Sequence, residues 1–385
     1  MRFSSSILDW ELKPITTLIE ECSETTSNFE KYPLYSFTIE DGVVPKSERY
    51  ERSFLVKKDG DSFKVVKYNN FVMNPMNLRF GAISYSKVKN DVSVSGYYNI
   101  FNIDNAQCND YWEALFRRTK TLKLYDSVAT GSLLEKKRVH FSQFRSLKFY
   151  IPEYNERIKI SLFFSKINER IDTQSKIIED LNIEKKVISD KIFSQKPIRK
   201  ELLCSFYNKG KAGGTPKSTN KKYYDGNIPF LSISDMTEQG KYLYRTQRTL
   251  TQEGLENSTA WIVPENSLIL SMYASVGQVA INKIPLATSQ AMFSMTLKDK
   301  STLDFLYYYL SFFRENKLHK YLETGTQSNI NADFVKSIEI PYYGESKNKQ
   351  IVSLLSLMDE RIQKEKDILS LYKKQKAYLL SNMFI

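Results

Sequence analysis

Few residues of this 385-residue chain have the types and spacing that catalysis requires. The glycine-rich residues 210–218 resemble a phosphate-binding loop, but the G-x-x-x-x-G-K-[ST] spacing is missing and Pro216 has no N–H to offer a phosphate. Asn74-Pro75-Met76 lacks the second proline and the aromatic ring of an amino-methyltransferase motif. His140 and His319 have no nucleophile or metal-ligand set beside them. We therefore expect this chain to have no catalytic activity and no metal site.

Charge and cysteine usage narrow the class of protein further. Lys and Arg outnumber Asp and Glu by 56 to 44, and this net charge of +12 favours an anionic partner such as nucleic acid or a membrane surface. The three cysteines are scattered without metal-ligand spacing, as in a reducing cytoplasm. No run approaches the about 18 apolar residues that a membrane-spanning helix needs, and the first residues have no signal-peptide core. We expect a cytoplasmic protein.

Residues 160–193 and 351–384 repeat one pattern at a constant offset of 191 residues. In both copies the apolar residues alternate at spacings of four and three, which is typical of a long helix that packs on another. A repeat of this length indicates that the chain has two halves. The predicted seam consists of Ile171, Gln174, Ile178, Leu181, Lys185, Ile188, Ile362, Glu365, Leu369, Tyr372, Lys376 and Leu379.

Polar residues interrupt both seams at matching positions and indicate how the helices pair. A parallel pairing would oppose Lys185 to Lys376, and two buried like charges are costly. An antiparallel pairing with a constant sum of residue numbers sets Lys185 against Glu365 and Gln174 against Lys376, with apolar residues opposite apolar ones. We therefore predict an antiparallel pair with these two polar contacts. The alternative is that the polar seam residues are solvated defects.

Each long helix follows a globular segment rich in short alternating stretches and turns. Residues 32–39, 63–66, 228–233 and 267–272 have strand character, and shorter helices are expected at residues 111–118 and 303–316. We expect an α+β chain with two pseudo-twofold-related β-rich domains separated by two long antiparallel helices. The expected boundaries are 1–152 for the first domain, 153–194 for the first helix, 195–343 for the second domain and 344–385 for the second helix.

A distinctive set of motifs runs through the second domain. They are Gly213-Gly214-Thr215-Pro216, residues 223–230, 233–236, 254–258 and 263–264, Ser275-Val276-Gly277 and Thr288-Ser289-Gln290. With these motifs the domain resembles the target-recognition domain of type I restriction–modification specificity subunits. The first domain resembles another version of it, at residues 35–36, 41–43, 48–50, 65–66, 71–76 and 80–83. Residues 350–362 and 379–384 extend the resemblance over essentially the full length.

The resemblance implies a non-catalytic DNA-recognition subunit, with one domain for each half of a split duplex target. It also implies two docked copies of a modification subunit, an S-adenosylmethionine-dependent adenine methyltransferase, and restriction subunits that can join them. The chain itself would bind no cofactor. About 35 helical residues at ~1.5 Å each give a rod of roughly 50 Å, comparable with one or more turns of DNA between half-sites. Glu169, Arg170, Glu360 and Arg361 would be available to the methyltransferase.

Candidate DNA contacts follow from side-chain chemistry. Lys and Arg suit phosphates, whereas Arg, Lys, Asn, Gln, Ser and Thr on loops suit bases. For each lysine the alternative is a merely solubilising surface role. The candidates in the first domain are Asn77, Arg79, Ser84, Tyr85, Ser132, Lys136, Lys137 and Arg138. Those in the second are Lys211, Gly213, Gly214, Thr215, Lys217, Ser218, Thr219, Lys221, Lys222, Tyr273, Ser275, Gln278, Thr326, Gln327, Ser328 and Asn329.

Three other functions remain open on the sequence. The chain could be a DNA-binding scaffold of the same fold outside a restriction system, which copurification of a methyltransferase would decide. It could be a self-contained methyltransferase or nuclease, against which the missing motifs argue. A purely structural coiled coil would not explain two diverged β-rich domains.

Overall fold

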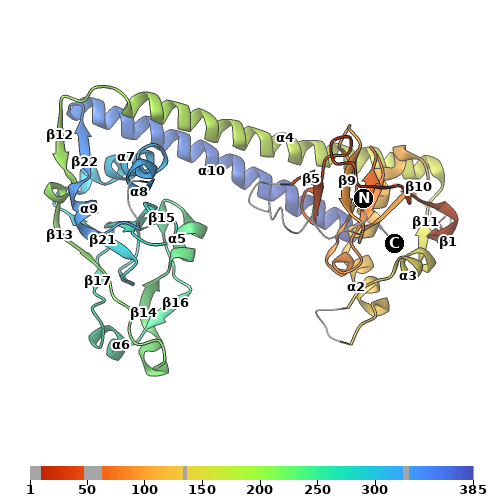
Figure 1. Cartoon of the computed structure of the whole chain (residues 1–385), viewed down its shortest axis with the longest axis horizontal. Helices are drawn as coiled ribbons and strands as arrows, with labels where there is room; N and C mark the ends of the chain where they lie inside the picture. Colours follow the sequence, from red (N-terminus) through yellow and green to blue (C-terminus); the bar gives the residue numbers. More distant parts are fainter. Residues whose placement is uncertain (1–9, 47–62, 133–136, 324–328, 385) are drawn as a thin grey trace. The chain divides into compact units, whose positions relative to one another are not determined.

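The computed structural model describes residues 10–46, 63–132, 137–323 and 329–384, and the chain divides into two compact units. Unit 1 comprises residues 1–177 and 365–385, and unit 2 comprises residues 178–364. Two long helices, α4 (Tyr154–Phe193) and α10 (Glu345–Asn382), each contribute one part to each unit (Figure 1). Among the helices of the described ranges, none has both the length and the apolar character that crossing a membrane requires.

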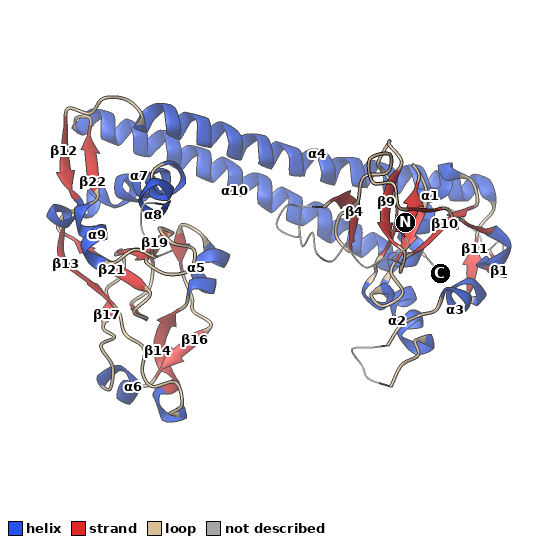
Figure 2. Cartoon of the chain, in the orientation of Figure 1, coloured by secondary structure: helices blue, strands red, loops and turns tan. Residues whose placement is uncertain are grey.

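Unit 1 is built from small antiparallel sheets, whose strands are rich in the aromatic and β-branched residues that favour extended backbone (Figure 2). Its core is largely aromatic and includes the fully buried Phe71, Phe101, Trp112 and Phe116. One sheet has the strand order β2 (Ile19–Glu21), β10 (Asn99–Ile103), β7 (Phe71–Met73) and β8 (Ile83–Tyr85). A second has the order β3 (Thr25–Thr26), β6 (Phe63–Val66) and β9 (Val92–Ser95). Two further strand pairs are β4 (Tyr35–Thr38) with β5 (Gly42–Pro45), and β1 (Glu11–Pro14) with β11 (Lys148–Ile151). The shorter helices are α1 (Asn109–Arg117), α2 (Thr119–Val128) and α3 (Phe141–Ser146).

Unit 2 has two larger mixed sheets and a separate strand pair. Its main core lies where α7 (Leu303–Asn316) packs with the strands that contain Leu268, Leu270 and Phe293. One mixed sheet has the strand order β13 (Tyr207–Ala212), β21 (Met292–Leu297), β18 (Leu268–Ser271), β19 (Val279–Asn282) and β15 (Tyr242–Leu243). The other has the order β16 (Arg248–Leu250), β14 (Tyr224–Leu231), β20 (Leu286–Thr288) and β17 (Ile262–Val263). The separate pair is β12 (Arg199–Leu202) with β22 (Glu339–Tyr342). The remaining helices are α5 (Ile233–Gln239), α6 (Gln252–Glu256), α8 (Leu318–Glu323) and α9 (Ala332–Ser337).

The α+β fold class is confirmed, and several elements lie where the sequence places them. The stretch 63–66 is β6, and 267–272 contains β18. The short helix expected at 111–118 is α1, and the one expected at 303–316 is α7.

The sequence repeat is also a repeat of contacts. In unit 1 the ring of Phe384, near the end of α10, lies 5.9 Å from the ring of Tyr111 on α1. In unit 2 the ring of Phe193, at the end of α4, lies 6.0 Å from the ring of Phe305 on α7. Phe193 and Phe384 occupy equivalent repeat positions, so each long helix ends in the aromatic core of one domain.

The antiparallel sense of the helix pair is confirmed within each unit. In unit 1, Phe164 stacks on Phe384, and further along α4 the side-chain amide of Gln174 donates to the Glu365 carboxylate at 2.5 Å. Residue numbers therefore rise on α4 as they fall on α10. In unit 2, Phe193 shares a core with residues near the start of α10. All twelve predicted seam residues are buried or half-buried.

The predicted polar pairing of the two helices is wrong. Lys185 forms its ion pair with Asp359 rather than Glu365, and Gln174 bonds to Glu365 rather than facing Lys376. The reason is that Asp359 also accepts a hydrogen bond from Tyr308 on α7, which makes it the better-supported partner for Lys185. An alignment of the two helices alone does not contain that tyrosine.

Candidate functional site

In unit 2 the Gly213-Gly214 step lies flat against the sheet. The Gly213 N–H donates to Met292 O at 3.2 Å, and the Gly214 N–H donates to Thr288 O at 2.9 Å. A Cβ atom on Gly213 would lie 1.9 Å from Thr288 O, and one on Gly214 would lie 2.2 Å from Thr259 Oγ1. Both glycines are buried, so they anchor the loop that follows.

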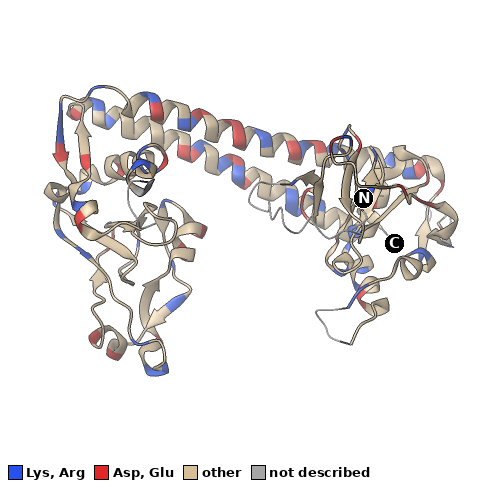
Figure 3. Cartoon of the chain, viewed as in Figure 1, with Lys and Arg blue, Asp and Glu red and all other residues tan. Residues whose placement is uncertain are grey.

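Beyond the glycines the chain exposes polar and basic side chains. Figure 3 colours the Lys and Arg positions of the chain blue. The loop is held from both ends, because Tyr224 OH donates to Pro216 O at 2.7 Å and the Asn220 side chain accepts from the Lys222 N–H at 3.1 Å. The predicted residues that lie exposed here are Thr215, Lys217, Ser218, Thr219, Lys221 and Lys222, with Lys211 exposed on the preceding strand. This loop, residues 215–222, offers cations and hydrogen-bond donors together.

Two other predicted segments connect to the same region of unit 2. Thr215 Oγ1 donates to Gln290 Oε1 at 2.5 Å, and the neighbouring Ala291 O accepts from the Met272 N–H at 2.7 Å. Met272 O in turn accepts from the Ile330 N–H at 3.2 Å. These hydrogen bonds connect four segments one after another. They are the loop of residues 215–222, residues 289–291, the turn after residue 272 and Asn329.

Gln290 is exposed on this path and was not among the predicted contacts. Its signal was its position in the Thr288-Ser289-Gln290 motif. Thr326, Gln327 and Ser328 lie outside the described residues.

The turn after β18 presents Tyr273, whose side chain is exposed, and Ser275. Ala274 and Ser275 have left-handed φ values of 38° and 46°, and the Ser271 hydroxyl stabilises the turn by donating to Tyr273 O at 2.6 Å. Gln278 behaves differently, because it lines a cavity of about 550 Å³ together with residues of α4 and α7. It therefore faces the long helix.

In unit 1 the predicted residues fall into two groups. The first gathers near α2: Arg79 forms an ion pair with Asp126 at 2.7 Å, and the Val139 N–H donates to Pro75 O at 3.0 Å. These contacts place Asn77 and Arg79 near Lys137 and Arg138. A hydrogen bond from Arg79, together with the charges of Arg79 and Lys137, lowers the pKa of Asp126. Ser132 is exposed, whereas Lys136 lies outside the described residues.

Ser84 and Tyr85 form the second group, which lies toward the long helices. Ser84 is buried, and a Cβ atom on Gly42 would lie 2.6 Å from its hydroxyl oxygen. Both residues line a cavity of about 240 Å³ with Lys376 and Asn168. Burial raises the pKa of Tyr85, and the nearby carboxylate of Asp110 adds to the effect.

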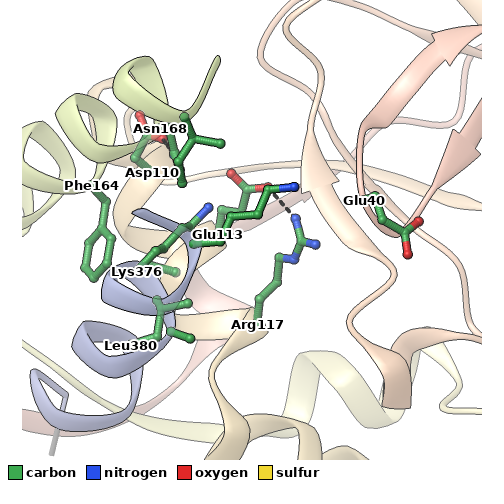
Figure 4. Close-up of a pocket in the computed structure, with 12 residues that line it drawn as sticks. Glu40, Asp110, Glu113, Arg117, Phe164, Asn168, Lys376 and Leu380 are labelled. Atoms are coloured by element: carbon green, nitrogen blue, oxygen red, sulfur yellow. Dashed lines mark hydrogen bonds and ion pairs between the residues drawn. The ribbon is translucent and has the colours of Figure 1, made fainter. Parts of the chain in front are cut away.

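An adjoining cavity of about 320 Å³ is lined by α1 and by both long helices in unit 1 (Figure 4). Glu113 pairs with Arg117 at 3.2 Å, and Asn168 Nδ2 donates to Asp110 Oδ1 at 2.8 Å. Burial raises the pKa of Asp110. Lys376 has no hydrogen-bond or ion-pair partner among the described residues, and desolvation lowers its pKa against the opposing effect of Glu113.

The equivalent positions of unit 2 are paired. The repeat offset relates Lys376 to Lys185 and Asn168 to Asp359. In unit 2 the lysine therefore meets a carboxylate, whereas in unit 1 the same place holds an amide that is bonded to Asp110.

Within the described ranges, no group of three or more His, Cys, Asp and Glu side chains is arranged to hold a metal ion.

Comparisons with known proteins bear on these surfaces. Residues 203–371 match the family model described as the type I restriction modification DNA specificity domain. The MjaIX specificity subunit of Methanocaldococcus jannaschii is 29% identical over 179 residues, which are 45% of this chain and 40% of that protein. The HindI specificity subunit of Haemophilus influenzae is 31% identical over 133 residues, 33% of this chain and 28% of that protein. The matched segments thus span less than half of each relative's length.

Solved structures resemble the whole chain. The crystal structure of the type I restriction–modification S subunit from M. genitalium has a TM-score of 0.58 at 13% identity, covering 100% of this chain and 98% of that one. A structure that concerns complex assembly and conformational transition of the type I R-M system has a TM-score of 0.57 at 12% identity, covering 97% and 96%. These likenesses concern the fold.

Proposed function

We propose that this chain is a type I restriction–modification specificity subunit and that it recognises a split duplex DNA target, with one β-rich domain for each half. The match of residues 203–371 to the DNA specificity domain and the similarity to specificity subunits support this proposal. The chain acts as the recognition component of an assembly whose catalytic subunits are other chains. The observation that carries the proposal is the exposed basic loop of residues 215–222, which lies inside the matched specificity domain and is anchored by two buried glycines.

The side chains of this loop suit DNA. Lys217, Lys221 and Lys222 are exposed cations for phosphates, and such contacts fix the position of a protein on the duplex. Thr215 and Gln290 are exposed polar groups that can bond to base edges. The combination supports both affinity and sequence discrimination.

Two different half-sites follow from the different surfaces of the two units. In unit 1 the basic residues come from residues 77–79 and 137–138, whereas in unit 2 they come from residues 215–222. The long helices would hold the half-sites apart, because the 40 residues of α4 extend about 60 Å at ~1.5 Å per residue. That length exceeds one turn of DNA.

Methyltransferase docking is supported by exposed apolar residues on the outer faces of the long helices. On the part of α10 in unit 1, Leu371 is 62% and Tyr378 68% exposed, and their spacing of 7 residues keeps them on one heptad face. On α4, Val187 is 59% exposed at the repeat position of Tyr378. Apolar rows of this kind mark partner surfaces.

Tyr378 has an apolar repeat partner in Val187, whereas the repeat position of Leu371 is Asp180. The two docked modification subunits are therefore proposed from the resemblance to type I specificity subunits. Each would be an adenine methyltransferase that binds S-adenosylmethionine, and restriction subunits would join this assembly.

The decisive experiment is to map methylated adenines genome-wide in cells that express the methyltransferase with and without this chain. We expect a split motif to be methylated only when the chain is present. A double variant, Leu371→Asp and Tyr378→Asp, should lose copurification with the methyltransferase, whereas Lys366→Ala, at an exposed position on another face of α10, should retain it. An unchanged methylation map would overturn the proposal and favour a DNA-binding scaffold outside a restriction system.

A further inference from the structure

A continuous polar network in unit 2 joins both long helices to the second recognition domain. Lys185 on α4 pairs with Asp359 on α10, and Asp359 accepts a hydrogen bond from Tyr308 on α7 at 2.7 Å. Lys241, next to β15, donates to the Tyr308 hydroxyl at 2.8 Å and pairs with Asp304 at 2.9 Å. We call these five residues the Tyr308 network.

The centre of the network is shielded from water, whereas the side chains of Lys185, Asp359 and Asp304 are 26%, 31% and 38% exposed. Tyr308 is 3% exposed, and the side chain of Lys241 is 12% exposed. The ammonium of Lys241 also lies 4.3 Å from the centre of the Tyr308 ring. The Tyr308 hydroxyl uses both its donor and an acceptor position, so this one oxygen links the domain to α10.

Apolar packing at the same place also holds the domain on the long helices, but it does not fix the angle between them. Phe193 and Leu355 of the long helices share a core with α7, and such contacts are non-directional. Hydrogen bonds weaken steeply when their angles change, so the network restricts the angle at which the domain sits on the helices. In unit 1 the equivalent lysine, Lys376, is unpaired among the described residues, so the network belongs to the second domain.

We propose that Tyr308, Asp359 and Lys241 are positioning residues that set the angle of the second recognition domain and thereby the half-site spacing that the protein accepts. This inference rests on the proposed function. A domain held at one angle accepts its half-site at one spacing from the other half-site. A domain that can rotate on the helices also accepts spacings that are slightly longer or shorter. Loss of the network should therefore widen the range of half-site spacings that the protein accepts, without changing the sequence of either half-site.

The test uses the complete complex of this chain with its methyltransferase. The target is first mapped with the wild-type chain, and a DNA pool is then made in which only the spacer between the half-sites varies. The variants are Tyr308→Phe and Asp359→Asn. The matched control is Glu345→Gln, which makes the same kind of change in an exposed ion pair of α10. The measured quantity is the methylation rate at each spacer length relative to the preferred one.

We expect both variants to methylate targets one base pair longer or shorter about tenfold better, relative to the preferred spacing, than the wild type or the control. Tenfold corresponds to about 1.4 kcal/mol. Unchanged spacing preference in the variants would overturn the inference. If Asp359→Asn does not fold, Tyr308→Phe decides alone, because it removes one oxygen and leaves the ring in the core. A wild-type complex that needs no split target would overturn the proposed function, and the inference with it.

Discussion

Gly213 and Gly214 act through their main chain, although their position in a polar loop suggested direct DNA contact. Both are buried, and the space for a side chain is filled by Thr288 and Thr259. The sequence could predict that this loop is exposed and basic beyond residue 214. It could not predict which residues lie flat against the sheet, because that depends on strands more than 70 residues away along the chain.

Replacing Gly213 with alanine should destabilise the protein by about 3 kcal/mol, because the new methyl group would overlap the Thr288 carbonyl oxygen. Urea unfolding measures the change. The control is Gly240→Ala, where nothing lies within 4 Å of the added atom and only the φ of 73° costs about 1 kcal/mol. Unchanged stability with weakened DNA binding would instead make Gly213 a DNA-binding residue.

Lys376 should behave oppositely to its repeat partner Lys185. Replacing Lys376 with methionine should stabilise the protein by about 1 kcal/mol at pH 7, because it removes a desolvated, unpaired charge. Replacing Lys185 with methionine should destabilise it, because Asp359 loses its ion-pair partner. Urea unfolding of both variants measures the difference.

The pH dependence of the Lys376 effect has a defined sign. The folded-state pKa of Lys376 lies below its usual value, so the folded state binds this proton less tightly than the unfolded state. The destabilisation by the Lys376 charge is complete below the folded-state pKa and disappears as pH rises toward the pKa of the unfolded state. The advantage of Lys376→Met should therefore shrink between pH 7 and pH 10; an advantage that grows would contradict the assignment.

At the scale of elements, the heptad pattern was enough to predict both long helices, and the like charges that a parallel pairing would oppose predicted their antiparallel sense. It was not enough to predict their register, since an apolar seam accepts shifts that keep apolar residues facing each other. The polar residues decide the register, and Lys185 takes Asp359 because Tyr308 of the domain also holds that carboxylate. Ser84, Tyr85 and Gln278 likewise face the long helices for reasons that lie outside their own segments.

A cross-linking experiment tests this register. In a background without Cys22, Cys108 and Cys204, Gln174→Cys with Glu365→Cys should be cross-linked by a short bifunctional thiol reagent, because the Gln174 amide reaches the Glu365 carbonyl oxygen at 3.2 Å. Gln174→Cys with Lys376→Cys is the control, since 11 residues along a helix correspond to about 16 Å. Mass spectrometry reports the cross-link, and cross-linking of the control pair would contradict the register.

The basic segment of unit 1 makes a prediction about salt dependence. Replacing Lys136, Lys137 and Arg138 together with alanine should flatten the plot of log affinity against log salt, by roughly 0.9 for each DNA phosphate that these side chains neutralise in the wild type. Titrations from low to physiological salt measure the slope, with Lys166→Ala on α4 as the control. An unchanged slope would remove this segment from the DNA footprint.

At the scale of the whole molecule, the chain consists of two versions of one plan, in which a β-rich domain is followed by a long helix. The helices kept equivalent contacts, as Phe193 and Phe384 show in their separate cores. The exposed loops of the two units diverged, so the helices are suited to one shared task and the domains to two different ones. The sequence repeat predicted this plan, whereas the DNA sequences that the proposed function requires the domains to recognise would depend on side-chain positions that no periodicity encodes.

The most direct test of the account is an exchange of residues 195–343 for the second recognition domain of a type I specificity subunit with a known target, followed by mapping of methylated adenines. We predict that one half of the methylated target changes, and that the other half and the spacing stay as they are in the wild type. A target that changes in both halves, or in neither, would contradict the claim that each domain recognises one half-site.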